Sequence, residues 1–244
     1  MDPSSSLPLG GDHLAQSLEQ GNGMQLVVLC ASALLLLWRS PPAHSSRSAR
    51  LSSQHHPVKT IATRLPGPLL LAPAVHGDAR GFFAETYRMA ELAELGVTDS
   101  FVQDNHSRSR RGVIRGMHFH IGEGVAKLVR CARGEILDVL VDLRRGSPTY
   151  GEWEGFALSD ENMRVLYCPV GFAHGFCVIS EVADVLYKQS AYYDAAVERG
   201  ISIDDPEVAI RWPAPPGQRV VSDRDRSAPT LREVAAELPF SIDS

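Results

Sequence analysis

Three histidines and one acid have the residue types and the spacing to form a reactive site. His118 and His120 lie two residues apart in an extended stretch, Gly112–Lys127, so both side chains point to the same face. Glu123 follows closely, and His174 comes after a Pro/Gly turn. Such a set suits a divalent transition metal, but it equally suits metal-free acid–base chemistry or a purely structural role. The residues alone leave all three interpretations open.

The segments that must position these side chains have the sequence pattern of short β-strands. Apolar runs separated by turn residues are typical of a β-sandwich or barrel, and no alternation of strands with helices is visible. The predicted strands are Ala126–Ala132, Glu135–Leu143, Val165–Pro169, Gly175–Ile179 and Ala183–Gln189. Helix signals are confined to Arg88–Leu95 and to a capping box, Thr230 with Glu233. We therefore predict one all-β barrel domain, residues 58–244, with a few short helices.

The strand predicted at Glu135–Leu143 has the clearest alternation. Its leucines and valines at odd-numbered positions fall on one face, whereas Asp138 and Asp142 fall on the other. This period of two predicts a half-buried strand, with the two acids on the face away from the core.

Composition excludes several classes of protein. The 244 residues are 44% hydrophobic and 22% charged, which is ordinary for a globular domain. The net charge is −5 and there is no basic block, so a nucleic-acid-binding protein is not expected. The four cysteines are irregularly spaced and form no C-x-x-C pair, so we expect reduced thiols and a cytoplasmic location.

Residues 1–57 differ from the rest of the chain and are not expected to belong to the domain. Their apolar run, Leu26–Trp38, is shorter than the ~20 residues of a membrane span. Asp12 and Glu19 precede the run, where a secretory signal would carry positive charge. Two interpretations stay open: a weak signal-like or anchoring segment, or a translation start that actually lies near Val58.

The histidine set loosely resembles the metal-binding cupins. Gly112, His118, His120 and Glu123 fit the first part of their signature, and the segment from Pro169 to His174 fits the second. The acid lies one residue nearer than that family favours. If this resemblance held, the ligands would be His118, His120, Glu123 and His174.

An ordered set of motifs carries a closer resemblance. It comprises Asp78–Glu85, Phe101–Ser107, Gly112–Phe119, Lys127–Arg130, Gly146–Gly151, Gly171–Phe176 and Val197–Gly200. Together these motifs resemble the RmlC family of dTDP-4-dehydrorhamnose 3,5-epimerases, which are cupin-type jelly-roll barrels. The resemblance implies an isomerase that epimerises dTDP-4-dehydro-6-deoxy-D-glucose at C3 and C5 through enolates, on the route to dTDP-L-rhamnose. It implies no metal and no other cofactor.

The resemblance also implies four catalytic residues. His118 matches the base, and a histidine suits that role because its pKa of ~6.5 lies near working pH. Asp225 matches the carboxylate that orients the base, and Lys127 matches the cation beside the ketone oxygen. Tyr187 matches the general acid, since a phenol with a pKa of ~10 keeps its proton at neutral pH. The alternatives for the last three are an acid in a surface turn, an outward-facing strand lysine and a core tyrosine.

Ten further positions match the family's substrate-binding residues. They are Arg80, Glu85, Gln103, Asp104, Asn105, Arg115, His174, Tyr193, Glu198 and Arg224. Arginine suits a diphosphate because its guanidinium makes bidentate contacts, and Tyr193 matches an aromatic that stacks on thymine. His120 departs from the family, which usually carries Gln there, and this keeps the metal alternative open. The resemblance further implies a homodimer in which N-terminal strands pair across subunits.

Three alternatives to the double epimerase stay open, and the first of them would share all of these motifs. One is an epimerase acting at a single carbon of a dTDP-4-keto-deoxysugar, and another is a metal-dependent cupin enzyme. The third is a sugar-nucleotide-binding module without activity.

Overall fold

The computed structural model describes residues 58–242. The predictions for residues 1–57, including the apolar run Leu26–Trp38, lie outside the described residues. No helix within residues 58–242 is long and apolar enough to cross a membrane.

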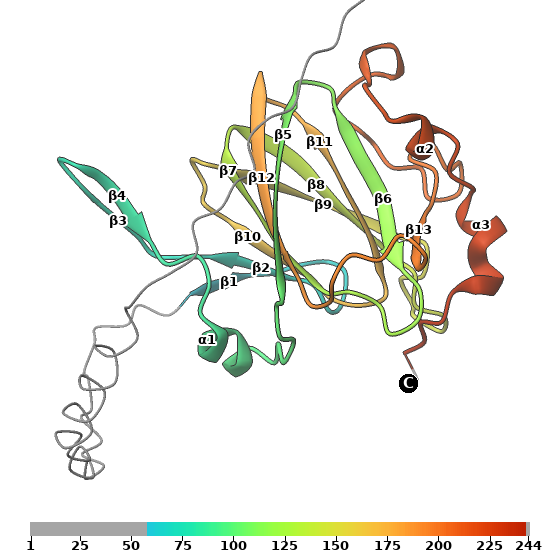
Figure 1. Ribbon diagram of the computed structural model, residues 1–244, viewed down its shortest axis with the longest axis horizontal. Coiled ribbons are helices and arrows are strands. Elements are labelled where there is room, and N and C mark those ends of the chain that lie inside the picture. The colour runs from blue at the N-terminus through green and yellow to red at the C-terminus, as the bar shows by residue number, and fades with distance from the viewer. Residues whose placement is uncertain (1–57, 243–244) are drawn as a thin grey trace, which may run out of the picture. The chain divides into compact units, whose positions relative to one another are not determined.

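Two antiparallel sheets face each other and enclose the interior of a barrel (Figure 1). Within residues 58–242 the larger sheet has six strands, in the spatial order β1 (Lys59–Ile61), β2 (Leu69–Ala72), β10 (Val165–Cys168), β7 (Lys127–Arg133), β12 (Val182–Gln189) and β5 (Gln103–Arg110). The smaller sheet of the same region has five, in the order β13 (Glu198–Gly200), β6 (Ile114–His120), β11 (Phe172–Val178), β8 (Glu135–Asp142) and β9 (Trp153–Ser159). The prediction of an all-β barrel is confirmed.

The remaining elements lie outside these two sheets. Strands β3 (Val75–Asp78) and β4 (Gly81–Ala84) form a hairpin that stands away from the barrel in Figure 1. The helices are α1 (Met89–Glu94), α2 (Asp223–Arg226) and α3 (Leu231–Val234), with 3₁₀ turns η1 (Pro216–Gln218) and η2 (Ala235–Glu237). Helix α3 begins with the predicted capping box, in which the Thr230 hydroxyl accepts from the Glu233 backbone N–H.

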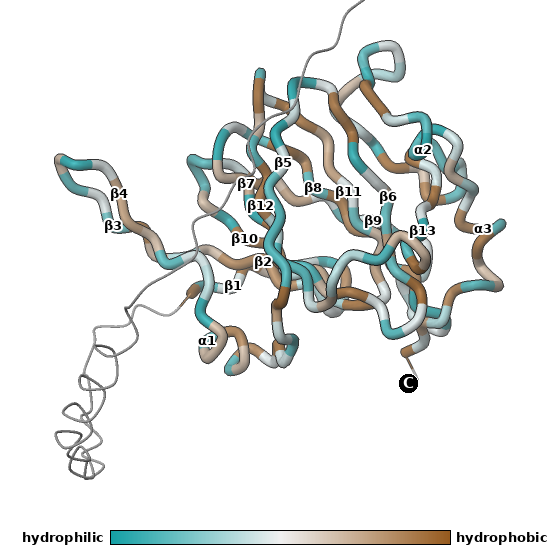
Figure 2. Tube along the Cα trace, viewed as in Figure 1, coloured by the Kyte–Doolittle hydropathy of each residue, from teal (hydrophilic) through white to brown (hydrophobic). Residues whose placement is uncertain are grey.

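The predicted strands are confirmed, with ends that differ by one to three residues. Strand β5 was not predicted because its sequence, QDNHSRSR, contains no apolar residue. Figure 2 shows it as a hydrophilic tube along much of its length. It forms because every residue of β12 pairs with it, which satisfies backbone groups that the side chains do not help to bury.

The half-buried prediction for β8 is wrong, because this strand is buried on both faces. Asp138 and Asp142 are fully buried, with 0% of each residue exposed. The C-terminal chain packs Leu231, Val234 and Phe240 on the outer face of the smaller sheet, in one cluster with the valines of β8. The face opposite those valines therefore lies inside the barrel, and the two aspartates lie on that face with Leu140.

Strands β6 and β11 approach unusually closely where they place two histidines opposite each other. His174 pairs with His118 in the register, next to an irregularity between His174 and Phe176. A Cβ added at Gly175 would lie 2.7 Å from Met117 Sδ and 2.8 Å from the Arg115 carbonyl oxygen. Only glycine permits this contact.

We expect Gly175→Ala to lower the free energy of unfolding by roughly 1–3 kcal/mol, because the added methyl group overlaps the backbone of β6. Chemical denaturation measures this change. The control is Gly77→Ala in the exposed hairpin, where the nearest atom to an added Cβ is 3.7 Å away. The control should change stability by less than about 0.5 kcal/mol, and equal effects of the two substitutions would contradict the close-approach argument.

Candidate active site

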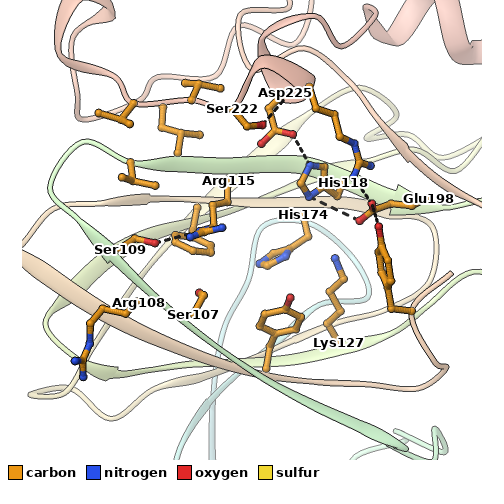
Figure 3. Close-up of a pocket in the computed structure, with 18 of the residues that line it drawn as sticks. Ser107, Arg108, Ser109, Arg115, His118, Lys127, His174, Glu198, Ser222 and Asp225 are labelled. Atoms are coloured by element: carbon orange, nitrogen blue, oxygen red, sulfur yellow. Dashed lines mark hydrogen bonds and ion pairs between the residues drawn. The ribbon is translucent and has the colours of Figure 1, made fainter. Parts of the chain in front are cut away.

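A cavity of about 670 Å³ opens between the two sheets, and Figure 3 shows most of the side chains that line it. The four residues predicted to be catalytic all line it. They come from three strands and one helix: His118 from β6, Lys127 from β7, Tyr187 from β12 and Asp225 from α2. Residues far apart in the sequence are therefore brought together in one interior space.

His118 lies between two carboxylates. Its Nε2 is 2.8 Å from Asp225 Oδ1, and its Nδ1 is 4.0 Å from Glu198 Oε1 (Figure 3). An ionised carboxylate can only accept a hydrogen bond, so Nε2 donates to Asp225 and the neutral ring keeps its lone pair on Nδ1. This arrangement leaves Nδ1 able to take a proton.

Asp225 is held by the start of helix α2. The Ser222 hydroxyl caps the helix by accepting a hydrogen bond from the Asp225 backbone N–H at 3.1 Å. The Gly116 backbone N–H donates to Asp225 Oδ2 at 3.4 Å. Only 6% of Asp225 is exposed, so the alternative of an acid in a surface turn is wrong.

Both carboxylates beside His118 favour the ionised form. Burial by itself would raise the pKa of Asp225, but the interaction with His118 and the hydrogen bonds from Gly116 and Ser222 lower it overall. Burial acts on Glu198 in the same way, and its 2.5 Å ion pair with Arg224, together with His118 and the Tyr193 hydrogen bond, outweighs it, so the pKa of Glu198 is also lowered. A proton gained by His118 would therefore form an imidazolium between two negative charges.

Lys127 and Tyr187 lie in the larger sheet, on the wall of the cavity that faces His118. Lys127 is 7% exposed, which excludes an outward-facing strand lysine. Burial lowers the pKa of its ammonium, while the charges of Glu198 and Asp138 oppose that shift. Burial and the negative charge of Glu198 raise the pKa of Tyr187, so its phenol is protonated at neutral pH. The Tyr187 ring also packs against the core, as the core-tyrosine alternative expects.

A second histidine–aspartate pair lies beside the first. His174 Nε2 is 2.9 Å from Asp138 Oδ1, and both side chains are buried. Burial lowers the pKa of His174, although Asp138 opposes the shift, so the ring is neutral. Sequence reasoning missed Asp138 because the alternation of β8 places it on the face that was expected to be exposed.

Amide and aromatic side chains form the end of the site next to β13. The Tyr193 backbone N–H donates to Gln103 Oε1 at 2.8 Å, and the Tyr193 hydroxyl donates to Glu198 Oε2 at 3.1 Å. Gln103 and Asn105 both donate to the side-chain oxygen of Gln189. Tyr193 is half exposed, so one side of its ring is accessible to a ligand.

Comparison with known proteins identifies the family of this chain. The family profile described as dTDP-4-dehydrorhamnose 3,5-epimerase matches residues 62–233. The chain belongs to this epimerase family. A relative of that name from Pseudomonas aeruginosa is 51% identical over 170 residues, which cover 69% of this chain and 93% of the relative. A dTDP-4-dehydrorhamnose 3-epimerase from Streptomyces niveus is 46% identical and covers 67% of this chain and 79% of its own length.

Solved structures of the family share the fold. The RmlC epimerase of Legionella pneumophila, crystallised with dTDP-4-keto-L-rhamnose, is 44% identical with a TM-score of 0.73. That match covers 75% of this chain and 98% of the Legionella protein. The predicted family and its jelly-roll barrel are thereby confirmed.

Most of the predicted substrate-binding residues lie at the cavity of this epimerase-family chain. Arg115, His174, Tyr193, Glu198 and Arg224 line it. Gln103 and Asn105 contact residues that line it.

Three predicted binding residues lie elsewhere. Arg80 is at the tip of the β3–β4 hairpin, where it pairs with Asp78. Glu85 pairs with Arg88 just after the hairpin. Asp104 is on the outer face of β5 and pairs with Lys188.

Sequence reasoning missed two serines that line the cavity on β5. Ser107 and Ser109 share a face with Asn105, because alternate residues of a strand point the same way. Ser109 accepts a hydrogen bond from Arg115 Nε at 3.1 Å. The alternation of side chains along Gln103–Arg110 is the sequence signal that could have predicted the positions of Ser107 and Ser109.

The set proposed for a metal does not converge in the part of the chain that the structure describes. No three His, Cys, Asp or Glu side chains of residues 58–242 are placed to hold a metal ion. His118 and His174 each bind a separate aspartate through Nε2. Neither nitrogen of His120 has a hydrogen-bond partner among the described residues.

We expect Lys127 to reduce the stability of the fold at neutral pH, because burial favours the uncharged form of its side chain. The unfolded chain binds the Lys127 proton more tightly, so this loss shrinks as the pH rises toward ~10.4. We expect Lys127→Met to raise the free energy of unfolding at pH 7 by roughly 1–3 kcal/mol. Chemical denaturation of the wild type and the variant at pH 7 and at pH 10 measures the difference in their free energies of unfolding at each pH.

The control for this substitution is Lys188→Met, which removes a partly exposed lysine paired with Asp104. It should change stability by less than about 1 kcal/mol at either pH. A Lys127→Met protein less stable than the wild type at pH 7 would contradict the buried-charge argument.

Proposed function

We propose that this chain is a dTDP-4-dehydrorhamnose 3,5-epimerase that converts dTDP-4-dehydro-6-deoxy-D-glucose to dTDP-4-dehydro-L-rhamnose. One observation carries the proposal: a base, His118, and an acid, Tyr187, face each other from opposite sheets across one cavity. Inverting a carbon beside a ketone requires a proton to leave one face and another to arrive on the opposite face. Groups on opposite walls meet this requirement for one carbon without the sugar having to turn over between the two proton transfers.

His118 removes the first proton. Its Nδ1 lone pair takes the proton from the carbon next to the ketone, and the C–H electron pair forms the enolate. The resulting imidazolium is stabilised by Asp225 at Nε2 and by Glu198 near Nδ1. Both acids are already ionised, so no other proton has to move in this step.

Lys127 and Tyr187 complete the reaction. The Lys127 ammonium stabilises the charge that develops on the enolate oxygen, and burial strengthens that interaction. Tyr187 then gives its proton to the opposite face of the carbon, and solvent restores the protonation of both residues. The same sequence at the second carbon gives the double epimer.

The rest of the cavity supports binding of a nucleoside diphosphate sugar. Arg115 and Arg224 supply cations to a protein of net charge −5, and the accessible side of Tyr193 suits stacking of thymine. His174, Gln103 and Asn105 supply further polar contacts. No cofactor is required by these steps, and the buried free thiols Cys131, Cys168 and Cys177 support a reducing compartment such as the cytoplasm.

Solvent deuterium tests the base and the reaction together. We expect wild-type protein in deuterated water to introduce deuterium at both C3 and C5 of dTDP-4-dehydro-6-deoxyglucose, as read by proton NMR. His118→Asn should slow the exchange by about 10²- to 10⁴-fold, the usual contribution of a general base. His106→Asn is the matched control, because His106 lies on the outer face of β5 beside Asp184.

Chelator treatment is part of the same experiment. Full exchange in chelator-treated protein supports the metal-free mechanism. Exchange that appears only after a divalent metal is added would instead support the metal-dependent cupin enzyme. Binding of dTDP without any exchange would support the inactive binding module.

A second candidate function is epimerisation at C3 alone. It is favoured by the 46% identity to the Streptomyces niveus protein that is named a 3-epimerase. Deuterium at C3 with none at C5 would assign the chain to this reaction.

We also propose that the protein is a homodimer. The β3–β4 hairpin exposes Phe82 and Phe83, which are 64% and 70% exposed, on a two-stranded sheet outside the barrel. A second copy of the chain would cover these rings. Such pairing would also carry Arg80 and Glu85 toward the cavity of the partner, which accounts for their absence from this one.

We expect the wild-type protein to have the mass of a dimer in light scattering and the double variant Phe82→Ser, Phe83→Ser to have that of a monomer. Tyr192→Ser is the control, since Tyr192 is 74% exposed but lies outside the hairpin, and it should remain dimeric. A monomeric wild type at micromolar concentration would overturn the proposal.

A further inference from the structure

His120 is a buried histidine for which the mechanism has no use. It is the last residue of β6, two positions after His118, and 4% of it is exposed. Neither ring nitrogen has a hydrogen-bond partner among residues 58–242. A buried polar group without a partner destabilises a fold, so a compensating role is expected.

Within residues 58–242 the ring of His120 packs against one aromatic residue at the cavity, Tyr193. Its centroid is 6.2 Å from that of Tyr193, and the two planes are inclined by 89°, which is edge-to-face geometry. In the β6–β13 register His120 is paired with Glu198, the acid that accepts from the Tyr193 hydroxyl. His120 thus lies behind the aromatic wall of the cavity, without lining the cavity itself.

Tyr193 is fixed at its backbone and at its hydroxyl but not along the sides of its ring. Its N–H donates to Gln103 and its hydroxyl donates to Glu198. Rotation of the ring between these two fixed points is limited by whatever packs beside it. Tyr193 is half exposed, and among the described residues the His120 ring supplies an aromatic surface that can limit this rotation.

The surroundings keep the His120 ring uncharged. Burial lowers its pKa, and the ammonium of Lys127 lowers it further, against the opposing charge of Glu198. A neutral ring adds no charge beside the groups that act on the substrate. It therefore contacts Tyr193 through its shape and aromatic edge.

We propose that His120 is a positioning residue that sets the orientation of the Tyr193 ring and thereby the affinity of the site for the nucleobase. The inference rests on the nucleotide-binding role proposed above for Tyr193. It predicts that His120 affects binding of the nucleotide half of the substrate, with little effect on proton transfer at the sugar.

Two substitutions distinguish the role of the flat His120 ring from the role of its nitrogens. His120→Leu removes the flat ring while keeping a similar volume, and His120→Phe keeps a flat ring but removes both nitrogens. Both replace an unpartnered polar group by an apolar one, so both variants should fold at least as well as the wild type, which thermal unfolding checks. Calorimetry with dTDP then measures binding directly.

We expect His120→Leu to weaken dTDP binding by about two- to tenfold, the range of an edge-to-face aromatic pair. KM should rise by the same factor while kcat stays within about twofold. His120→Phe should bind dTDP within about twofold of the wild type. In a Tyr193→Ala background, His120→Leu should produce no further loss, because the contact is already absent.

The outcomes that would contradict the role of His120 differ from those that would contradict the proposed function. Wild-type dTDP affinity in His120→Leu, an equal loss in His120→Phe, or a loss that persists without Tyr193 would overturn this inference alone. A fall in kcat with unchanged KM would also overturn it. A wild-type protein that neither binds dTDP nor exchanges deuterium would overturn the proposed function, and this inference with it.

Discussion

The 2.8 Å hydrogen bond between His118 Nε2 and Asp225 Oδ1 is the contact on which the arrangement of the site depends. It fixes the tautomer of the base and directs the lone pair of Nδ1. It also links β6 to the C-terminal chain, which must fold back over the barrel to bring Asp225 into the interior. The bond therefore joins the chemistry of the site to the completion of the fold.

The path of the C-terminal chain explains how a carboxylate so far along the sequence reaches His118. Val220 pairs with the turn between β5 and β6 through two backbone hydrogen bonds. Its N–H donates to the Gly112 carbonyl, and its carbonyl accepts from the Ile114 N–H. Ser222 then starts helix α2 and leaves Asp225 in its first turn. Beyond it, α3 packs on the outer face of the smaller sheet. The same segment covers the outer face of the barrel and supplies a residue to the inside.

This path is also the reason why the sequence predicted some features and not others. Apolar runs predicted the strands of the core, and the spacing of His118 and His120 predicted their shared face, because both depend on residues near in sequence. Asp138 and Asp142 are buried inside the barrel, and the valines on the opposite face of β8 are covered by Leu231, Val234 and Phe240 of the distant C-terminal chain, so the alternation of β8 alone gave the wrong face for exposure. Strand β5 was missed for a related reason, since its pairing partner β12 holds it in place rather than its own side chains. The positions of Lys127, Tyr187 and Asp225 around one cavity were implied by the family resemblance and not by their spacing.

The interior of the barrel holds many charged and polar groups, which is costly for a fold unless each of them has a partner. Asp225, His118, Glu198 and Arg224 form a series in which each acid lies next to at least one basic residue. Asp138 and His174 form a second, shorter pair. Lys127 is outside both series, and so is His120. Lys127 lies next to the sugar end of the proposed binding site, where it would contact a bound substrate, and His120 lies next to the nucleobase end, where it packs against Tyr193.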